Sequence, residues 1–215
     1  CTDDNARALI LTLLLPDAGT ADRGTDDKKF GHLTDTYAAF LNHAYAPAHG
    51  RFRNFMSYDR RWLEDVGSDD STGRTLWALG TCVGRSDDRN RVTWAVNLFE
   101  NVLPAVVQMT SPRAWAFTLL GIHEYQKKFS DDRLTKTIQR QLLQKLMDRY
   151  VASAETDWPW FEHSLSYDNA VLAHALLLSG DAAAQETGLK ALRWLLKLQT
   201  AEDGHFQPIG CNGFY

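Results

Sequence analysis

The chain has 215 residues, of which 44% are hydrophobic and 23% are charged, a composition typical of a single globular domain and not of a disordered or fibrous protein. Its net charge is -4 and its basic residues form no continuous stripe, so a nucleic acid partner is not expected. The longest apolar run, residues 8–15, is well short of the roughly 20 residues that span a bilayer, so no membrane partner is expected either. The three cysteines are far apart and lack metal-ligand spacing, which fits a cytoplasmic protein without a zinc site.

Apolar residues recur at spacings of three and four through nearly the whole chain, the pattern of amphipathic helices. Strand patterns are confined to short pieces around residues 51–56 and 205–207, which predict small hairpins inside loops. The sequence therefore predicts an all-α protein. The expected helices cover residues 6–15, 33–45, 76–83, 92–107, 115–125, 134–150, 170–178 and 188–198.

Alternate helices are preceded by residues that can accept hydrogen bonds from unpaired helix amides. The helices between them are longer and more charged. This alternation favours repeated helical hairpins, each burying one face against its neighbours. It predicts an (α/α) toroid spanning residues 1–215, with about four of six hairpins present and the inner helix starts facing a shared cavity. The polar starts are Asp3-Asp4, Ser68 to Ser71, Thr110 to Pro112 and Ser166 to Asp168.

Five stretches carry a resemblance to a known family: residues 1–8 (CTDDNARA), 55–62 (FMSYDRRW), 73–80 (GRTLWALG), 111–116 (SPRAWA) and 157–162 (DWPWFE). Together they resemble a bacterial helical domain that occurs fused to, or beside, group 1 glycosyltransferases. The resemblance implies a fold similar to the six-hairpin glycosidase superfamily, a carbohydrate role, a glycosyltransferase domain or neighbour as partner, and a chain truncated at both ends. The chain shows no alternation of strands and helices and no glycine-rich nucleotide loop, the features of a sugar-nucleotide enzyme.

The cluster at residues 157–163 is the richest candidate site. Trp158 or Trp160 would stack on a pyranose ring, and Glu162 or Asp157 would protonate a glycosidic oxygen as the general acid. The alternative is an aromatic plug that seals a loop and leaves Glu162 solvated.

Acid pairs open two of the expected inner helices. One acid of each pair is expected to cap its helix, which leaves the other free to activate water as an inverting glycosidase requires. Two arginines lie about one turn further on and would hold these acids or a sugar hydroxyl. The acids are Asp3, Asp4, Asp69 and Asp70, and the arginines are Arg7 and Arg74.

Four further residues complete the candidate binding residues. Asp59 and Trp62 either line a sugar subsite or, in the case of Asp59, form an ion pair with a neighbouring arginine. Asp168 repeats the acid-then-amide pattern of the first helix start and is either a cap or a ligand contact. His205 lies in a loop from which it could reach the cavity.

The leading hypothesis from sequence is an inverting glycoside hydrolase that needs no metal and no cofactor. One alternative is a sugar epimerase on a similar toroid, with His174 and His205 exchanging protons with carbon. Another is a carbohydrate-binding module without activity that serves a glycosyltransferase. For His123 and His174, which fall inside apolar helices, burial in the core is the simpler expectation.

Overall fold

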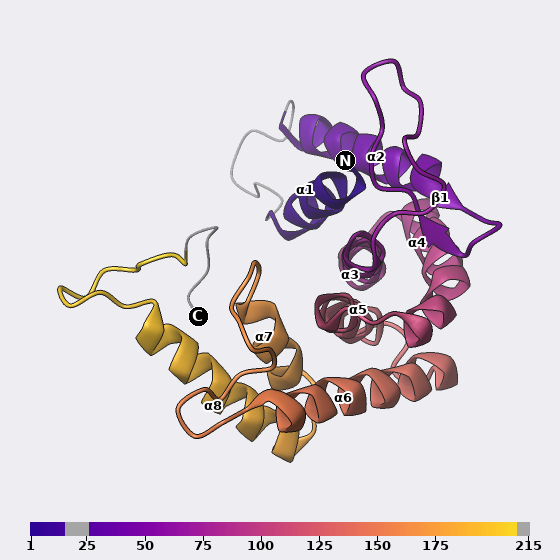
Figure 1. Cartoon of the computed structure of the whole chain (residues 1–215). Coiled ribbons are helices and arrows are strands. Elements are labelled where there is room, and N and C mark those ends of the chain that lie inside the picture. Colours follow the sequence, from indigo (N-terminus) through magenta and orange to yellow (C-terminus); the bar gives the residue numbers. More distant parts are fainter. Residues whose placement is uncertain (16–25, 210–215) are drawn as a thin grey trace.

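The computed structural model describes residues 1–15 and 26–209, and the described chain is mostly helical, which confirms the all-α class (Figure 1). Within these ranges it has eight α-helices, one 3-10 helix and one two-stranded sheet. The helices are α1 (Thr2–Leu14), α2 (Asp26–Ala44), α3 (Asp69–Arg85), α4 (Arg89–Val102), η1 (Leu103–Gln108), α5 (Pro112–Tyr125), α6 (Arg133–Ser153), α7 (Ala170–Leu177) and α8 (Ala182–Leu198).

The helices form two layers arranged in an arc (Figure 1). In the inner layer, α3 lies between α1 and α5, and α7 lies against α5. Each inner helix also contacts the outer helix that follows it in the chain, which gives four inner–outer pairs: α1 with α2, α3 with α4, α5 with α6, and α7 with α8. The inner helices therefore all begin at one end of the layer and finish at the other.

Helices α3 and α5 make the most extensive contact in the molecule, and glycines allow it. A Cβ atom added at Gly80 would lie 2.0 Å from the backbone oxygen of Gly121, and one added at Gly73 would lie 2.6 Å from the backbone oxygen of Ala114. Any larger residue would force the two backbones apart, because a carbonyl oxygen cannot move as a flexible side chain can. This close approach fixes the positions of the side chains at both ends of the two helices.

The helix starts follow the predicted polar segments, but the capping residues differ from the expectation. Ser68 caps α3 and Ser111 caps α5, each by accepting a hydrogen bond from an amide of the first turn. Neither Asp69 nor Asp70 caps the helix in which it lies. At α1, Asn54 of the loop between β2 and α3 takes the place of a local cap, since its carbonyl accepts from the Thr2 amide at 2.8 Å and its side-chain oxygen accepts from the Asp3 amide at 3.2 Å.

One predicted helix is interrupted. The helix expected at 92–107 changes from α-helical to 3-10 geometry at Leu103, because Pro104 lacks the amide that would continue the α-helical hydrogen bonds. The predicted small hairpins are present. Strand β1 (Tyr45–Ala46) pairs antiparallel with β2 (Arg51–Phe52), and a single bridge joins Thr200 to Phe206.

Candidate functional site

The starts of the inner helices are held together by Arg74, a buried arginine in the second turn of α3. Its side chain is 4% exposed, and its guanidinium lies 3.8 Å from the ring centre of Phe117. Arg74 donates through Nε to Asp3 at the start of α1 and through a terminal nitrogen to Asp168, which precedes α7. One guanidinium therefore binds two carboxylates that come from opposite sides of the inner layer.

Asp168 has an unusual backbone conformation for a residue with a side chain, with φ of 49°. This left-handed conformation is sparsely populated outside glycine, asparagine and aspartate, and it costs free energy. The hydrogen bond between Arg74 and the Asp168 carboxylate offsets this cost, so the conformation persists. The sequence pattern predicted a cap or a ligand contact at Asp168. Its carboxylate instead binds Arg74 and makes no side-chain cap to α7.

A second buried arginine, Arg113 in the first turn of α5, organises the loop that precedes α7. Its terminal nitrogens pair with both carboxylate oxygens of Glu162, at 3.1 and 2.9 Å. It also donates to the Tyr167 carbonyl at 2.6 Å and to the Asn169 side-chain oxygen at 3.3 Å. Arg113 thus determines where the 157–169 loop lies relative to the inner helices.

Asp70 lies between these two arginine clusters and differs from the other acids. One of its oxygens accepts a hydrogen bond from the Ser111 hydroxyl and the other accepts one from the Tyr167 hydroxyl. Burial, together with the carboxylate of Asp70, raises the pKa of Tyr167 well above its usual range, so the phenol remains a donor. Within the described chain, Asp70 has no ion-pair partner.

Asp69 has a structural role. One oxygen accepts amide hydrogen bonds from Thr110 and Ser111, at 2.9 and 3.3 Å, and the other binds Arg51 at 2.7 Å. Burial opposes the charge of the Asp69 carboxyl, but the two amides and Arg51 outweigh it and lower the pKa. Asp69 therefore satisfies the backbone ahead of α5 and ties it to the β2 strand.

The structure places several predicted site residues outside this network. Asp4 is 74% exposed and, among the described residues, bonds only to groups of Cys1. Arg7, by contrast, is half exposed but joins the edge of the network, because it pairs with Asp3 at 2.9 Å. Asp59 lies on an exposed turn with Ser57 and Arg61, whose hydrogen bonds lower its pKa.

Trp62 packs on α2, with ring centres 5.8 Å from Phe40 and 5.4 Å from His43. The ion-pair interpretation of Asp59 is therefore the one that the structure matches, and Trp62 serves to anchor the loop against α2. Neither side chain is brought to the arginine network.

The tryptophans at 158 and 160 form an aromatic cluster with Trp194 of α8. Ring centres lie 4.8 Å apart for Trp158 and Trp194, and 5.6 Å apart for Trp160 and Trp194. Trp160 has 0% exposure, so the prediction that it stacks on a sugar does not hold for this structure. Trp158 is partly buried and donates its ring N–H to the Glu162 carbonyl at 2.6 Å. The plug interpretation therefore describes both indoles, whereas Glu162 is ion-paired and not solvated.

Two remaining candidates lie apart. Asp157 is exposed and its side chain has no hydrogen bond or ion pair among the described residues. His205 is exposed in the loop after α8 and pairs with Asp203, whereas His174 lines a pocket with His123. The epimerase hypothesis pairs His174 with His205, but the histidine that shares this pocket with His174 is His123.

Sequence reasoning missed two residues that organise the network, Arg113 and Tyr167. Both lie inside motifs that the sequence singled out, Ser111 to Ala116 and Ser166 to Asn169. The available signal for Arg113 was its position two residues after a serine cap, similar to Arg74 a few residues after Ser68. Arginines near helix starts oppose the helix dipole and are therefore unusual.

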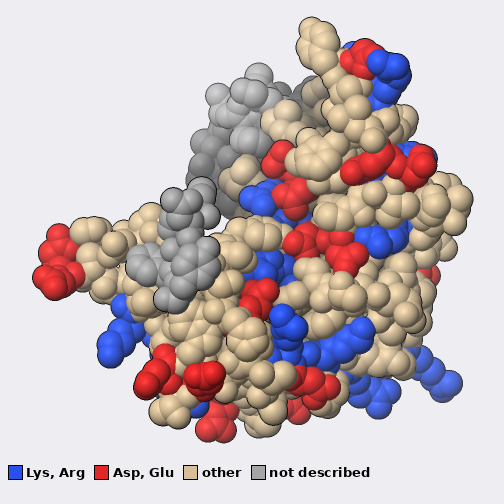
Figure 2. Space-filling model, in the orientation of Figure 1, with Lys and Arg blue, Asp and Glu red and all other residues tan. Residues whose placement is uncertain are grey.

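A surface with many charged side chains covers this network (Figure 2). Figure 2 shows acidic and basic side chains side by side over the middle of the face where α1, α3 and α7 lie in Figure 1. Among the described residues, no group of three or more histidine, cysteine or carboxylate side chains could hold a metal ion. None of the described helices is long and apolar enough to cross a membrane.

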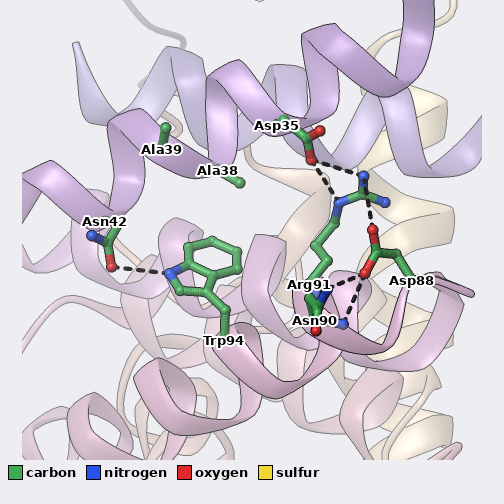
Figure 3. A pocket seen from close by; sticks show the side chains of 8 residues that line it. All are labelled: Asp35, Ala38, Ala39, Asn42, Asp88, Asn90, Arg91 and Trp94. Carbon is green, nitrogen blue, oxygen red and sulfur yellow. Dashed lines mark hydrogen bonds and ion pairs between the residues drawn. The ribbon is translucent and has the colours of Figure 1, made fainter. Parts of the chain in front are cut away.

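A pocket of about 290 Å³ opens between the outer helices α2 and α4 (Figure 3). Arg91 donates to Asp35 at 2.8 Å and lies 4.0 Å from Asp88. Trp94 donates its ring N–H to the Asn42 side chain at 3.0 Å. These polar groups are partnered with one another, so the pocket is a contact between outer helices and offers few groups to a ligand.

Comparison of the chain with models of protein families, with curated proteins and with solved structures finds no match.

Proposed function

We propose that the chain is a carbohydrate-active domain that binds a glycan where the inner helices begin. The observation that carries the proposal is the convergence, at this end, of carboxylates from separate segments of the chain around two buried arginines. Carboxylates accept hydrogen bonds and guanidinium groups donate them, and sugar hydroxyls need both. The half-exposed ring of Tyr167 adds an aromatic face beside Arg113, 5.0 Å from its guanidinium.

The arrangement of the helices supports an (α/α) toroid of the six-hairpin glycosidase type. Four inner–outer pairs lie in an arc with their inner helix starts at one end. That arrangement is what a ring of hairpins requires of its consecutive members. In this proposal the arginine network belongs to the ligand-binding end of the ring.

The reaction we propose is hydrolysis of a glycosidic bond with inversion, with Asp70 as the general base. Asp70 receives two hydroxyl hydrogen bonds and, within the described chain, no cation, so its carboxylate is available to take a proton from water. The water oxygen bonds to the anomeric carbon as the bond to the leaving oxygen breaks. That oxygen takes a proton from an acid of the 157–169 loop, Glu162 or Asp157.

The test is hydrolysis of a panel of bacterial oligosaccharides followed by proton NMR of the anomeric signals. Asp70→Asn and Glu162→Gln are expected to lower the rate by about 100-fold or more, because a general acid or base contributes about that factor. Asp59→Asn removes an exposed carboxylate and is expected to leave the rate unchanged. Full activity of both Asp70→Asn and Glu162→Gln, or retention of anomeric configuration, would contradict the mechanism.

One observation favours a second candidate, a carbohydrate-binding module. Both oxygens of Glu162 face Arg113, so the carboxyl must leave this pair before it donates a proton. A module would hold acceptor glycan for a glycosyltransferase domain or neighbour. A module predicts saturable glycan binding that Arg113→Met weakens. It also predicts no turnover, either in the parent protein or in Asp70→Asn.

A further inference from the structure

The opposite end of the inner layer carries a second concave feature, far along the helices from the arginine network. A pocket of about 330 Å³ is lined by the C-terminal halves of all four inner helices. Its volume lies within the range of about 300–1,000 Å³ that small-molecule sites occupy. Aliphatic side chains of α1 and α5 and Leu178, directly after α7, line it together with one indole and six polar or charged side chains.

The charged groups of the pocket already have partners. Arg85 binds both oxygens of Glu124, at 2.9 Å each, and Lys127 binds the same carboxylate at 2.7 Å. Burial opposes the charge of Glu124, but Arg85 and Lys127 outweigh it and lower its pKa, so the carboxylate stays charged. These three side chains form a fixed wall of the pocket.

Three other polar groups of the pocket have no hydrogen-bond partner in the described chain, whereas the Thr81 hydroxyl donates to the Trp77 carbonyl at 2.8 Å. Across residues 1–15 and 26–209, no protein group hydrogen-bonds to the rings of His123 and His174 or to the ring N–H of Trp77. His123 and Trp77 are half-buried, and His174 is exposed on the same inner face. Core burial, the simpler expectation for the two histidines, is therefore wrong. Polar groups that line a cavity without protein partners are available to a ligand.

The charge of the pocket selects the ligand class. Partial burial of the His174 ring within the pocket, and to a smaller extent His123, lowers the pKa of His174, which favours the uncharged ring near neutral pH. Three of the lining helices carry one basic residue in their last turn, near the negative end of the helix dipole. These residues are Arg85 in α3, His123 in α5 and His174 in α7. Arg85 and Lys127 both bind the Glu124 carboxylate, so an anion would find no cation without a protein partner in the described lining.

We propose that this pocket binds a neutral, polyhydroxylated small molecule such as a monosaccharide. A neutral imidazole offers one donor and one acceptor, and an indole offers a donor and a flat apolar face. Hydroxyl groups donate and accept, so they match two imidazoles and an indole N–H. The site is separate from the proposed hydrolytic end, and its ligand does not depend on the reaction assigned there.

The test is a titration of the full chain, labelled with 15N-histidine, with D-glucose, D-mannose and D-galactose up to 50 mM. At least one sugar is expected to shift the ring signals of both His123 and His174 along a saturable curve. Trp77→Phe and His174→Gln are each expected to weaken this binding by about fivefold or more, in line with the loss of one hydrogen bond. His49→Gln, in the exposed turn after β1, is the matched control and is expected to bind as the parent protein does.

Two outcomes overturn the proposal. The first is the absence of a saturable shift for all three sugars in a protein whose amide spectrum is intact. The second is binding that Trp77→Phe and His174→Gln leave unchanged while both variants remain folded by the same spectrum. Asp70→Asn separates this site from the hydrolytic one, because it is expected to abolish hydrolysis and to leave the histidine shifts unaltered.

Discussion

The two ends of the inner layer are built from the same four helices and differ in how their polar groups are partnered. At the starts, Arg74 and Arg113 bind carboxylates from α1 and from the loop before α7. At the C-terminal ends of the helices, His123 and His174 line a pocket, and their rings have no protein hydrogen-bond partner in the described chain. The first end is held mainly by ion pairs around two buried arginines, whereas the imidazoles of the second end have no protein hydrogen-bond partner. Removal of a charged group at the helix starts is therefore expected to cost more stability than removal of a histidine at the opposite end.

The largest expected effect comes from Gly80→Ala, which acts on both ends at once. The new methyl group would meet the Gly121 carbonyl oxygen at 2.0 Å, so α3 and α5 must separate, at a cost of about 3 kcal/mol or more. Chemical denaturation measures the loss. Gly31→Ala in α2 is the matched control, because it meets nothing within 4 Å and is expected to stabilise the helix by up to about 1 kcal/mol.

Arg113→Met is expected to be the next most damaging substitution, and its effect is confined to the helix starts. It leaves Glu162 without its cation. A fully buried pair that loses one partner costs about 3–5 kcal/mol, and the 19% exposure of the Glu162 side chain brings the expected cost to about 2–3 kcal/mol. Arg7→Met removes a half-exposed arginine from a pair within one helix and is expected to cost less than about 1 kcal/mol. Equal losses in the two variants, by urea denaturation, would contradict the assignment of Arg113 as an organising residue.

Asp69→Asn is expected to destabilise the protein by about 2 kcal/mol at pH 7, since hydrogen bonds to a charged group are lost. The Asp69 carboxyl has a folded-state pKa below its ordinary value of 3.8, so its contribution is complete above that pH and is lost as pH falls through the folded-state value. The difference between parent and variant should therefore shrink in acid. A difference that is constant from pH 7 to pH 2.5 would show that Asp69 does not act through its charge.

The smallest expected effect is at the other end, from His174→Gln. The folded state holds the pKa of His174 below 6.5, so the unfolded chain takes up the proton first and stability falls as pH drops below 6.5. Glutamine cannot take up that proton, so the variant should lose less stability than the parent between pH 7.5 and pH 5.5. His123, Glu124, Arg85 and Lys127 line the same pocket and are unchanged in both proteins. Denaturation midpoints at the two pH values decide the comparison, and equal losses would contradict it.

The sequence predicted the helical class and the polar helix starts because those depend on local chemistry. Periodicity marks apolar faces, and serines such as Ser68 and Ser111 accept amide hydrogen bonds wherever a helix begins. The change to 3-10 geometry at Leu103 also depends on a local residue, Pro104. The helical spacing of apolar residues continues past Pro104, so the pattern predicted one uninterrupted helix.

The partners of the site residues could not be predicted because they are set by contacts between distant segments. Asp70 meets Tyr167, and Glu162 meets Arg113, only after α3, α5 and the loop before α7 have come together. The same holds for Trp160, whose burial depends on Trp194 of α8. Composition made these tryptophans conspicuous, but only packing separates a core indole from a binding one.

The double pairing of Arg74 bears on the order in which the chain assembles during synthesis. Asp3 lies 71 residues before Arg74 and Asp168 lies 94 residues after it, so the ribosome synthesises the second partner long after the first. At about 5–20 residues per second, roughly 5–20 s separate the two events on the ribosome. During that interval only Asp3 can bind the guanidinium of Arg74. The first hairpins lack the contact with Asp168, which follows α6 in the chain.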